Sequence, residues 1–264
     1  MHIPRKRFGQ HFLKDPAAVR RILDAIEPQR HDQMLEIGPG QGVLTEQLLH
    51  HVAHLHAVEI DTELAALLQH RFTPQQLTLF RTDILKFDLA RLSGRQAGRL
   101  RIVGNLPYNI STPILFHLVR FIADIQDCHL LLQKEVVQRM VATPGSKTYG
   151  RLSVMCQYYF QADRLFDIGP QAFRPAPKVV STFVRLRPAN HTGLALESSG
   201  DFSTLVRTAF SQRRKTLGNA LKKLLDPEQI RQVGIDPAVR AETLRLEQFV
   251  ALANQLTQAR LDSR

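Results

Sequence analysis

Short apolar runs alternate with helix-like segments along the first half of this chain of 264 residues, and that alternation limits the fold more than any other feature. Strands that are separated in sequence by single helices usually pair in parallel, because each helix returns the chain to the starting edge of the sheet. The pattern therefore predicts an α/β fold with a mostly parallel sheet. The first expected strands cover residues 34–37, 54–59, 77–80 and 100–104, with helices over residues 44–49 and 64–71.

A helix precedes the first strand, and three more strands follow the fourth. Asp15 and Pro16 suit a helix N-cap and a first helical position, and apolar residues then recur with helical spacing up to Ile26. A further helix is expected over residues 113–121, with Ser111 or Thr112 as its cap. The remaining strands are expected over residues 130–133, 152–159 and 179–186, which completes a seven-stranded, Rossmann-like sheet.

Beyond the last expected strand the composition changes. Between about Ala189 and Gly200 the sequence is polar and turn-rich, and only helical periodicity follows. We therefore expect a sheet-bearing domain over residues 1–190, a linker over 191–200 and a small all-helical domain over 201–264, with basic clusters at 213–215 and 222–223.

The formal net charge of +11 is the strongest compositional signal. Such an excess attracts polyanions, so nucleic acid is the expected partner, with a generically basic protein as the alternative.

No run approaches the roughly 18 uncharged apolar residues of a membrane span. Cys128 and Cys156 lie in apolar, strand-like runs, which favours buried thiols over a disulfide and a reducing, cytoplasmic location.

A glycine-rich turn with Gly38, Gly40 and Gly42 follows the first expected strand, and glycine lets a backbone approach a ligand closely. Its spacing differs from the dinucleotide fingerprint, so alone it is a weak indication. Glu59 ends the next strand, where a carboxylate can accept from both hydroxyls of a ribose. Asp83 follows the third, where it can accept from the exocyclic amine of an adenine. Each acid alone is typical of a solvated strand end, but together these residues predict a nucleoside pocket.

The segment Asn-Leu-Pro-Tyr at 105–108 follows the fourth strand and suits a planar amine. The lone pair of adenine N6 is delocalised into the ring, so acceptors that draw on its two hydrogens help to direct it toward a methyl donor. The amide oxygen of Asn105 supplies one acceptor, and the main-chain carbonyl of Leu106 or Pro107 supplies the second. Tyr108 offers a ring on which an extruded base can stack. The alternative is an Asn-cornered turn with a core tyrosine.

Because these segments follow successive strands, they meet at one edge of a parallel sheet. They predict a pocket for S-adenosylmethionine beside a pocket for adenine, and so an adenine methyltransferase. Phe173 begins a stiff, basic loop and is expected to cover the other face of the base, with a hydrophobic plug as the alternative. The histidines at 50, 51, 54 and 56 lack an acidic partner and zinc-type spacing, so no metal site is expected.

Along nearly its whole length the chain resembles the KsgA/RsmA family of small-subunit ribosomal RNA adenine dimethyltransferases. One shared segment, Phe-Ser-Gln-Arg-Arg-Lys-Thr-Leu-Gly-Asn at 210–219, lies in the helical tail and favours this branch. Besides it and the four segments above, the matching parts are residues 8–13, 132–135, 149–153 and 173–180.

The resemblance implies a class I methyltransferase whose N-terminal residues 1–14 close over S-adenosylmethionine. It implies cofactor contacts from His11 and Leu13, although many members carry Asn where this chain has His11. It also implies that Gly38, Glu59, Asp83 and Asn105 line the cofactor site, with Asn105 and Tyr108 facing the base.

The implied reaction is four methyl transfers, two to each of two adjacent adenosines in a hairpin loop near the 3′ end of 16S rRNA. It takes place during small-subunit assembly, the partner is the small ribosomal subunit, and nothing demands more than a monomer. Two alternatives stay open: a 23S rRNA adenine methyltransferase of the macrolide-resistance type, and a non-catalytic RNA-binding assembly factor on the same fold. A DNA adenine methyltransferase usually has a second proline in place of Leu106.

Overall fold

The computed structural model describes residues 10–92, 99–191 and 193–262, which belong to two compact units. The described parts of residues 1–137 and 161–188 form the first unit, and those of residues 138–160 and 189–264 form the second. Each unit is therefore discontinuous in sequence, because the chain leaves the first for one helical segment and then returns to it.

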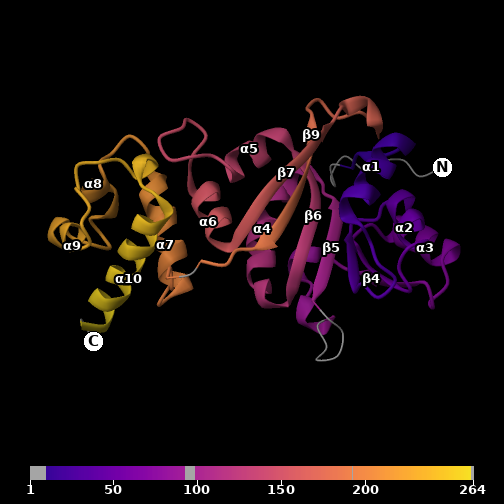
Figure 1. The fold of residues 1–264 in the computed structure, drawn as a ribbon, viewed down its shortest axis with the longest axis horizontal. Coiled ribbons are helices and arrows are strands. Elements are labelled where there is room, and N and C mark those ends of the chain that lie inside the picture. The colour runs from indigo at the N-terminus through magenta and orange to yellow at the C-terminus, as the bar shows by residue number, and fades with distance from the viewer. Residues whose placement is uncertain (1–9, 93–98, 192, 263–264) are drawn as a thin grey trace. The chain divides into compact units, whose positions relative to one another are not determined.

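One seven-stranded sheet dominates the first unit, in the order β4-β3-β2-β5-β6-β9-β7 (Figure 1). The pairs from β4 through β6 are parallel, and β9 runs antiparallel to β6. This confirms the predicted mostly parallel α/β sheet. Its strands are β2 (Met34–Ile37), β3 (Leu55–Glu59), β4 (Leu77–Arg81), β5 (Leu100–Asn105), β6 (Ile125–Gln133), β7 (Phe160–Ile168) and β9 (Ser181–Pro188).

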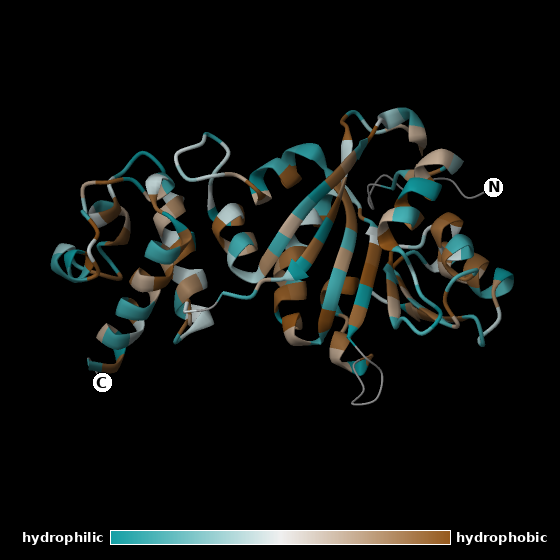
Figure 2. Ribbon diagram, viewed as in Figure 1, coloured by the Kyte–Doolittle hydropathy of each residue, from teal (hydrophilic) through white to brown (hydrophobic). Residues whose placement is uncertain are grey.

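Helices cover both faces of this sheet. All four residues of β2 are buried, and apolar residues run along β5 in Figure 2, as expected where a parallel strand has protein on each side. The predicted start of the first helix is confirmed, because Asp15 accepts a hydrogen bond from the backbone N–H of Ala17 and Pro16 is the first helical residue. The helices are α1 (Pro16–Ile26), α2 (Val43–Leu48), α3 (Thr62–Arg71), α4 (Ser111–Val119) and α5 (Lys134–Met140).

A second, two-stranded sheet holds the N-terminal segment in place. In it β1 (Phe12–Leu13) pairs antiparallel with β8 (Phe173–Arg174), and the N–H of Lys14 donates to the carbonyl of Ala172 at 2.8 Å. The beginning of the described chain is therefore attached to the loop that precedes β9.

The second unit is helical. Tyr149 is fully buried in it and donates its hydroxyl to the carbonyl of Leu244 at 3.0 Å. Arg213 bonds the carbonyl of Tyr149 at 3.0 Å and pairs with Glu242 at 3.1 Å. The helices are α6 (Arg151–Tyr159), α7 (Ser199–Ser211), α8 (Leu217–Leu221), α9 (Pro227–Gln232) and α10 (Leu246–Asp262).

The strand expected over residues 152–159 is wrong, because these residues form helix α6. They make a short, almost continuous apolar run, and periodicity alone cannot separate a buried helix from a buried strand in such a run. The missing strand of the sheet is β7, which follows directly. Cys156 therefore lies on a helix and Cys128 on β6, and both thiols are buried and free. Residues 138–160 thus group with the C-terminal helices, whereas the sequence placed them in the sheet-bearing domain.

One buried arginine ties the amino-terminal edge of the sheet together. Arg101 on β5 bonds Asp127 on β6 at 2.9 Å and Asp32 before β2 at 2.6 Å. Its guanidinium also donates to the carbonyls of Ile26 at 2.7 Å and Glu27 at 3.4 Å, which are the last carbonyls of α1. A planar guanidinium with five N–H donors can bond these four acceptors at the same time.

We predict that Arg101→Met lowers the free energy of unfolding by about 3 kcal/mol or more, because two buried carboxylates then lose their counter-charge. Arg99→Met is the matched control, since Arg99 lies two residues earlier and is exposed. Urea denaturation of the full chain measures both. Equal midpoints for the two variants would contradict the prediction.

Candidate active site

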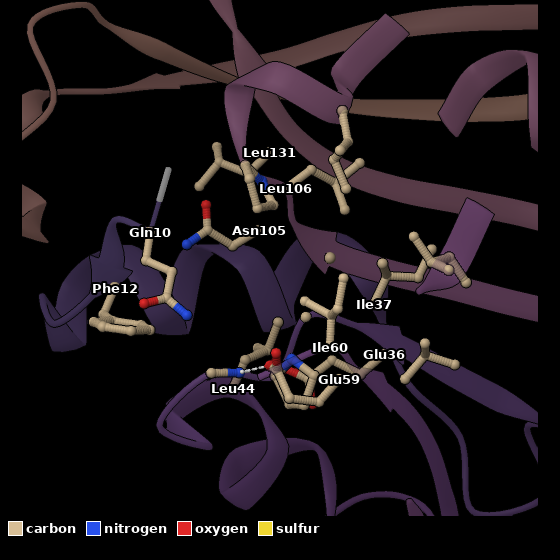
Figure 3. A pocket seen from close by; sticks show the side chains of 18 of the residues that line it. Gln10, Phe12, Glu36, Ile37, Leu44, Glu59, Ile60, Asn105, Leu106 and Leu131 are labelled. Atoms are coloured by element: carbon tan, nitrogen blue, oxygen red, sulfur yellow. Dashed lines mark hydrogen bonds between the residues drawn. The ribbon is translucent and has the colours of Figure 1, made fainter. Parts of the chain in front are cut away.

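A cavity of about 270 Å³ lies where strands β2, β3, β4 and β5 end (Figure 3). The N-terminal segment from Gln10 to Leu13 forms another part of its wall. The structure brings ten of the eleven predicted site residues to this cavity: His11, Leu13, Gly38, Gly40, Glu59, Asp83, Asn105, Leu106, Pro107 and Tyr108.

The glycine turn forms the floor of the cavity. Gly38 and Gly40 have φ angles of +67° and +57°, a conformation that other residues rarely adopt. A Cβ atom at Gly40 would lie 2.9 Å from the ring of Phe12, so the N-terminal segment can pack there only against glycine. Apart from Gly38 itself and its two neighbours in the chain, no atom of the described residues lies within 4 Å of a Cβ built at Gly38, which leaves space there for a ligand.

Glu59 ends β3 with its carboxylate fixed by the backbone. Its Oε2 accepts from the N–H of Gly40 at 3.1 Å and its Oε1 from the N–H of Asp61 at 2.9 Å. The side chain is buried, and burial raises the pKa of Glu59 although both hydrogen bonds act to lower it. Each oxygen keeps further acceptor capacity for a ligand hydroxyl.

Glu36 is a second buried carboxylate at the cavity, and the sequence analysis gave it no role. Its Oε2 accepts from the hydroxyl of Thr45 at 2.6 Å, and its side chain lies close to Glu59 in Figure 3. Burial raises the pKa of Glu36 to about 7, the bond from Thr45 lowers it and the charge of Glu59 raises it further. An acid inside an otherwise apolar strand was the signal in the sequence that could have identified it.

Asp83 follows β4 and caps a 3₁₀ helix, Ile84–Lys86. Its Oδ1 accepts from the N–H of Leu85 at 3.0 Å, which orients the carboxylate at the wall of the cavity. The other oxygen, Oδ2, accepts from no described residue. It is the acceptor that the adenine prediction requires.

Asn105, at the end of β5, is oriented by the N-terminal segment. Its Nδ2 donates to the main-chain carbonyl of His11 at 2.8 Å. A carbonyl can only accept, so this bond determines which end of the amide faces His11. The amide oxygen Oδ1 is then left at the cavity, and no described residue donates to it.

The two candidate main-chain acceptors after Asn105 differ in their hydrogen bonds. The carbonyl of Pro107 already accepts from the N–H of Ile110 at 3.1 Å and the hydroxyl of Ser111 at 3.5 Å. The carbonyl of Leu106 accepts from no described residue. Leu106 therefore has the carbonyl with free acceptor capacity.

Tyr108 and His11 form a pair of rings beside Asn105. The ring centroids lie 5.4 Å apart with a tilt of 31°. The Tyr108 hydroxyl shares a 3.0 Å hydrogen bond with the hydroxyl of Ser181, and burial raises the pKa of Tyr108. His11 donates from Nδ1 to the carbonyl of Pro175 at 2.7 Å, which is an acceptor only.

Gln10 completes the attachment of the N-terminal segment. Its Nε2 donates to Oδ2 of the buried Asp61 at 3.2 Å, just beyond β3. Residues 10–13 therefore bond to the ends of β3 and β5 and to the loop before β9. Residues 1–9 of the predicted closing segment lie outside the described residues.

Phe173 differs from its expected place. Its side chain is 3% exposed and packs in the core of the first unit, while its backbone pairs with Leu13. It does not line the cavity, so in this structure it cannot cover a base there. An apolar side chain between a short sheet and the core is better satisfied by burial than by the solvent-facing side of the site.

The described residues contain neither a membrane-spanning helix nor a cluster of metal-binding side chains. None of the helices in that part of the chain is long and apolar enough to span a membrane. Within the same residues, no group of three or more histidine, cysteine or acidic side chains is arranged to hold a metal ion.

Comparisons with known proteins agree on one group. The family model described as ribosomal RNA adenine dimethylase matches residues 1–258. The ribosomal RNA small subunit methyltransferase A of Aromatoleum aromaticum is 50% identical over 255 residues, which are 97% of this chain and 95% of that protein.

Two solved structures share the fold at low sequence identity. A dimethyladenosine transferase from Plasmodium falciparum gives a TM-score of 0.74 at 24% identity and covers 92% of this chain and 96% of its own. The 23S rRNA methyltransferase ErmE gives a TM-score of 0.66 at 23% identity and covers 94% of this chain and 100% of its own.

The raised pKa of Glu36 generates a prediction about stability. The folded protein holds a proton on Glu36 up to a pKa of about 7, whereas the unfolded chain loses it near the ordinary glutamate pKa of 4.5. The unfolded state therefore binds fewer protons in this window, and the wild type loses stability as the pH rises from 4.5 to 7. Glu36→Gln removes this loss, on the order of 3 kcal/mol above pH 7.

Urea denaturation without ligand, between pH 4.5 and 8, measures that difference. The control is Glu46→Gln on α2, which makes the same substitution at a side chain that is 46% exposed. If Glu36→Gln follows the wild-type pH dependence, Glu36 is not a proton-holding group in the folded protein.

Proposed function

The chain belongs to the ribosomal RNA adenine dimethylase family, and we propose that it transfers methyl groups to N6 of two adjacent adenosines in a hairpin loop near the 3′ end of 16S rRNA. It is an rRNA adenine dimethyltransferase that acts on the small subunit. Relatives named for that subunit at about half identity over nearly the whole chain support this reading, whereas the likeness to the 23S enzyme concerns the fold.

The arrangement of Asn105 carries the proposal. Its Nδ2 is held by the carbonyl of His11, so its Oδ1 faces the cavity and can accept one hydrogen of the target amine. The free carbonyl of Leu106 can accept the other. Two acceptors in the plane of the base leave the N6 lone pair perpendicular to that plane, where a methyl donor can be attacked.

The residues of the cavity suit S-adenosylmethionine as the methyl donor. Glu59 can accept from the ribose hydroxyls, Asp83 from the adenine amine, and the open backbone at Gly38 admits the chain of the cofactor. Burial raises the pKa of both Glu36 and Glu59, and a positively charged ligand would favour their ionised forms. When bound, S-adenosylmethionine supplies a methyl group activated by its sulfonium charge.

The rate enhancement then comes from alignment of the target amine with the methyl donor and from exclusion of water. Tyr108 supports the extruded base by stacking, and its hydroxyl bond to Ser181 holds the ring in one orientation. No strong base is needed, because the amine proton can leave after transfer. A second methylation requires that an amine with one methyl re-enter beside Asn105, and the apolar side chains of Leu106 and Leu131 border that space.

The substrate is small-subunit RNA, and the basic helical residues 201–264 are proposed to bind it. The net charge of +11 supports binding to a polyanion. We place the enzyme in the cytoplasm, acting as a monomer during assembly of the subunit.

The proposed substrate is tested by transfer of labelled methyl groups from S-adenosylmethionine to unmethylated small subunits, large subunits and DNA, followed by nucleoside analysis. We expect dimethyladenosine in small-subunit RNA alone. Label in large-subunit RNA instead would assign the chain to the macrolide-resistance type. Binding to small subunits with no label anywhere would favour the non-catalytic assembly factor.

We predict that Asn105→Ala lowers the rate of methyl transfer on the order of 100-fold or more, because the target amine loses its fixed acceptor. RNA affinity should stay within a few-fold, since phosphate contacts dominate it. Asn105→Asp keeps an acceptor but loses the donor to His11, and its two negative oxygens repel that carbonyl, so it should also be slow. Single-turnover rates and RNA binding measured side by side test this, and equal losses of binding and rate would contradict it.

A further inference from the structure

The loop over residues 174–179, here called the rim loop, has no role in the proposed chemistry, although it lies beside the target pocket. It contains Pro175 and Pro177, which limit its backbone to few conformations. Phe173 anchors its start in the core, and Pro177 is buried as well. The rest of the loop projects from these fixed points.

Hydrogen bonds fix the chain at the start of the rim loop and just after its end, and two of them involve the cavity residues His11 and Tyr108. At its start, Pro175 accepts the hydrogen bond from His11 at 2.7 Å. Just after it, Val180 accepts from the N–H of Lys134 at 3.0 Å, and Ser181 bonds the hydroxyl of Tyr108 at 3.0 Å. The loop is therefore fixed at the edge of the pocket that Tyr108 and His11 line.

The rim loop carries two exposed cations, Arg174 and Lys178, and neither forms an ion pair with any residue in the described ranges. The strands next to it differ in this respect. Asp167 pairs with Lys134 and Arg164, and Asp163 pairs with Arg185 and Arg187. Each of these four cations thus has a carboxylate partner, although two carboxylates neutralise only half of their charge, whereas the cations of the rim loop have no carboxylate partner among the described residues and are available to an anionic partner.

The rim loop also exposes an apolar side chain. Val179 is 43% exposed, among the few large hydrophobic residues of the described chain that face solvent, and it follows Lys178 directly. Only Val180 separates it from Ser181, which bonds the hydroxyl of Tyr108. Proteins that extrude or unstack a base commonly place an apolar side chain where the base has left the stack.

We propose that the rim loop binds the RNA strand that carries the target adenosine. Arg174 and Lys178 contact the phosphates that flank this nucleotide, and Val179 occupies the gap that the extruded base leaves in the stack. The inference rests on the proposed function, because it presupposes an adenosine that enters the pocket from RNA.

The proposed phosphate contacts of Arg174 and Lys178 are tested with the double variant Arg174→Gln/Lys178→Gln. Each lost phosphate contact lowers the slope of log affinity against log salt by roughly 0.7–0.9, so we expect a decrease of about 1.4–1.8 for binding to small-subunit RNA. The matched control is Arg30→Gln/Arg99→Gln, two exposed cations next to the opposite, amino-terminal ends of β2 and β5. Equal slopes for the two double variants would overturn this part.

The proposed insertion of Val179 into the stack, where it acts as an apolar wedge, is tested with Val179→Ala and Val179→Thr. These substitutions shorten the side chain or make it polar. We expect the single-turnover rate at saturating RNA to fall about five-fold or more while RNA affinity is unchanged, because the extruded state loses its support. Val179→Leu keeps an apolar wedge and should retain the rate. Leu67→Ala on α3, where Leu67 is 46% exposed, is the control for loss of an exposed aliphatic side chain.

The wild-type enzyme is measured first in both experiments. If it does not methylate small-subunit RNA, the proposed function fails. If it does, and Val179→Ala keeps the wild-type rate, the wedge is refuted while the proposed function stands.

Discussion

Parallel pairing of β3, β2, β5 and β6 is the constraint on which the rest of the site depends. It brings the ends of strands that are far apart in sequence to one edge, so Gly38, Glu59 and Asn105 meet without any local sequence relation. Arg101 holds the opposite edge of the same strands through Asp127 and Asp32. The ion pairs of Arg101 at the amino-terminal ends of the strands thus stabilise the sheet whose carboxyl-terminal ends carry the candidate site.

The N-terminal segment converts that edge into an enclosed site. It packs on Gly40 through Phe12, bonds Asp61 through Gln10 and orients Asn105 through the carbonyl of His11. One segment therefore lines the proposed cofactor side of the cavity and orients the proposed acceptor for the target amine. In the proposed enzyme, anything that moves this segment changes both sides of the reaction together.

Much of the fold, and the position of most candidate site residues at one cavity, could be predicted from the sequence for a physical reason. Strand-helix alternation and polar residues at strand ends can be recognised locally in the sequence. Parallel pairing then places those strand ends at one edge of the sheet. Residues 152–159 failed as a strand because a buried apolar run has no period that separates helix from strand. The positions of Phe173 in the core and of Glu36 at the cavity could not be predicted from the sequence. They depend on which side of the backbone faces the cavity, and packing between distant segments determines that side.

The central claim is that the bond from Asn105 Nδ2 to the carbonyl of His11 leaves Oδ1 facing the target amine. A crystal structure of the enzyme with S-adenosylhomocysteine and an RNA hairpin that carries the target adenosine measures this directly. The account predicts Oδ1 of Asn105 and the carbonyl of Leu106 within hydrogen-bond distance of N6, with the bond to His11 retained. An adenosine bound elsewhere, or an Asn105 amide turned with Nδ2 toward N6, would contradict it.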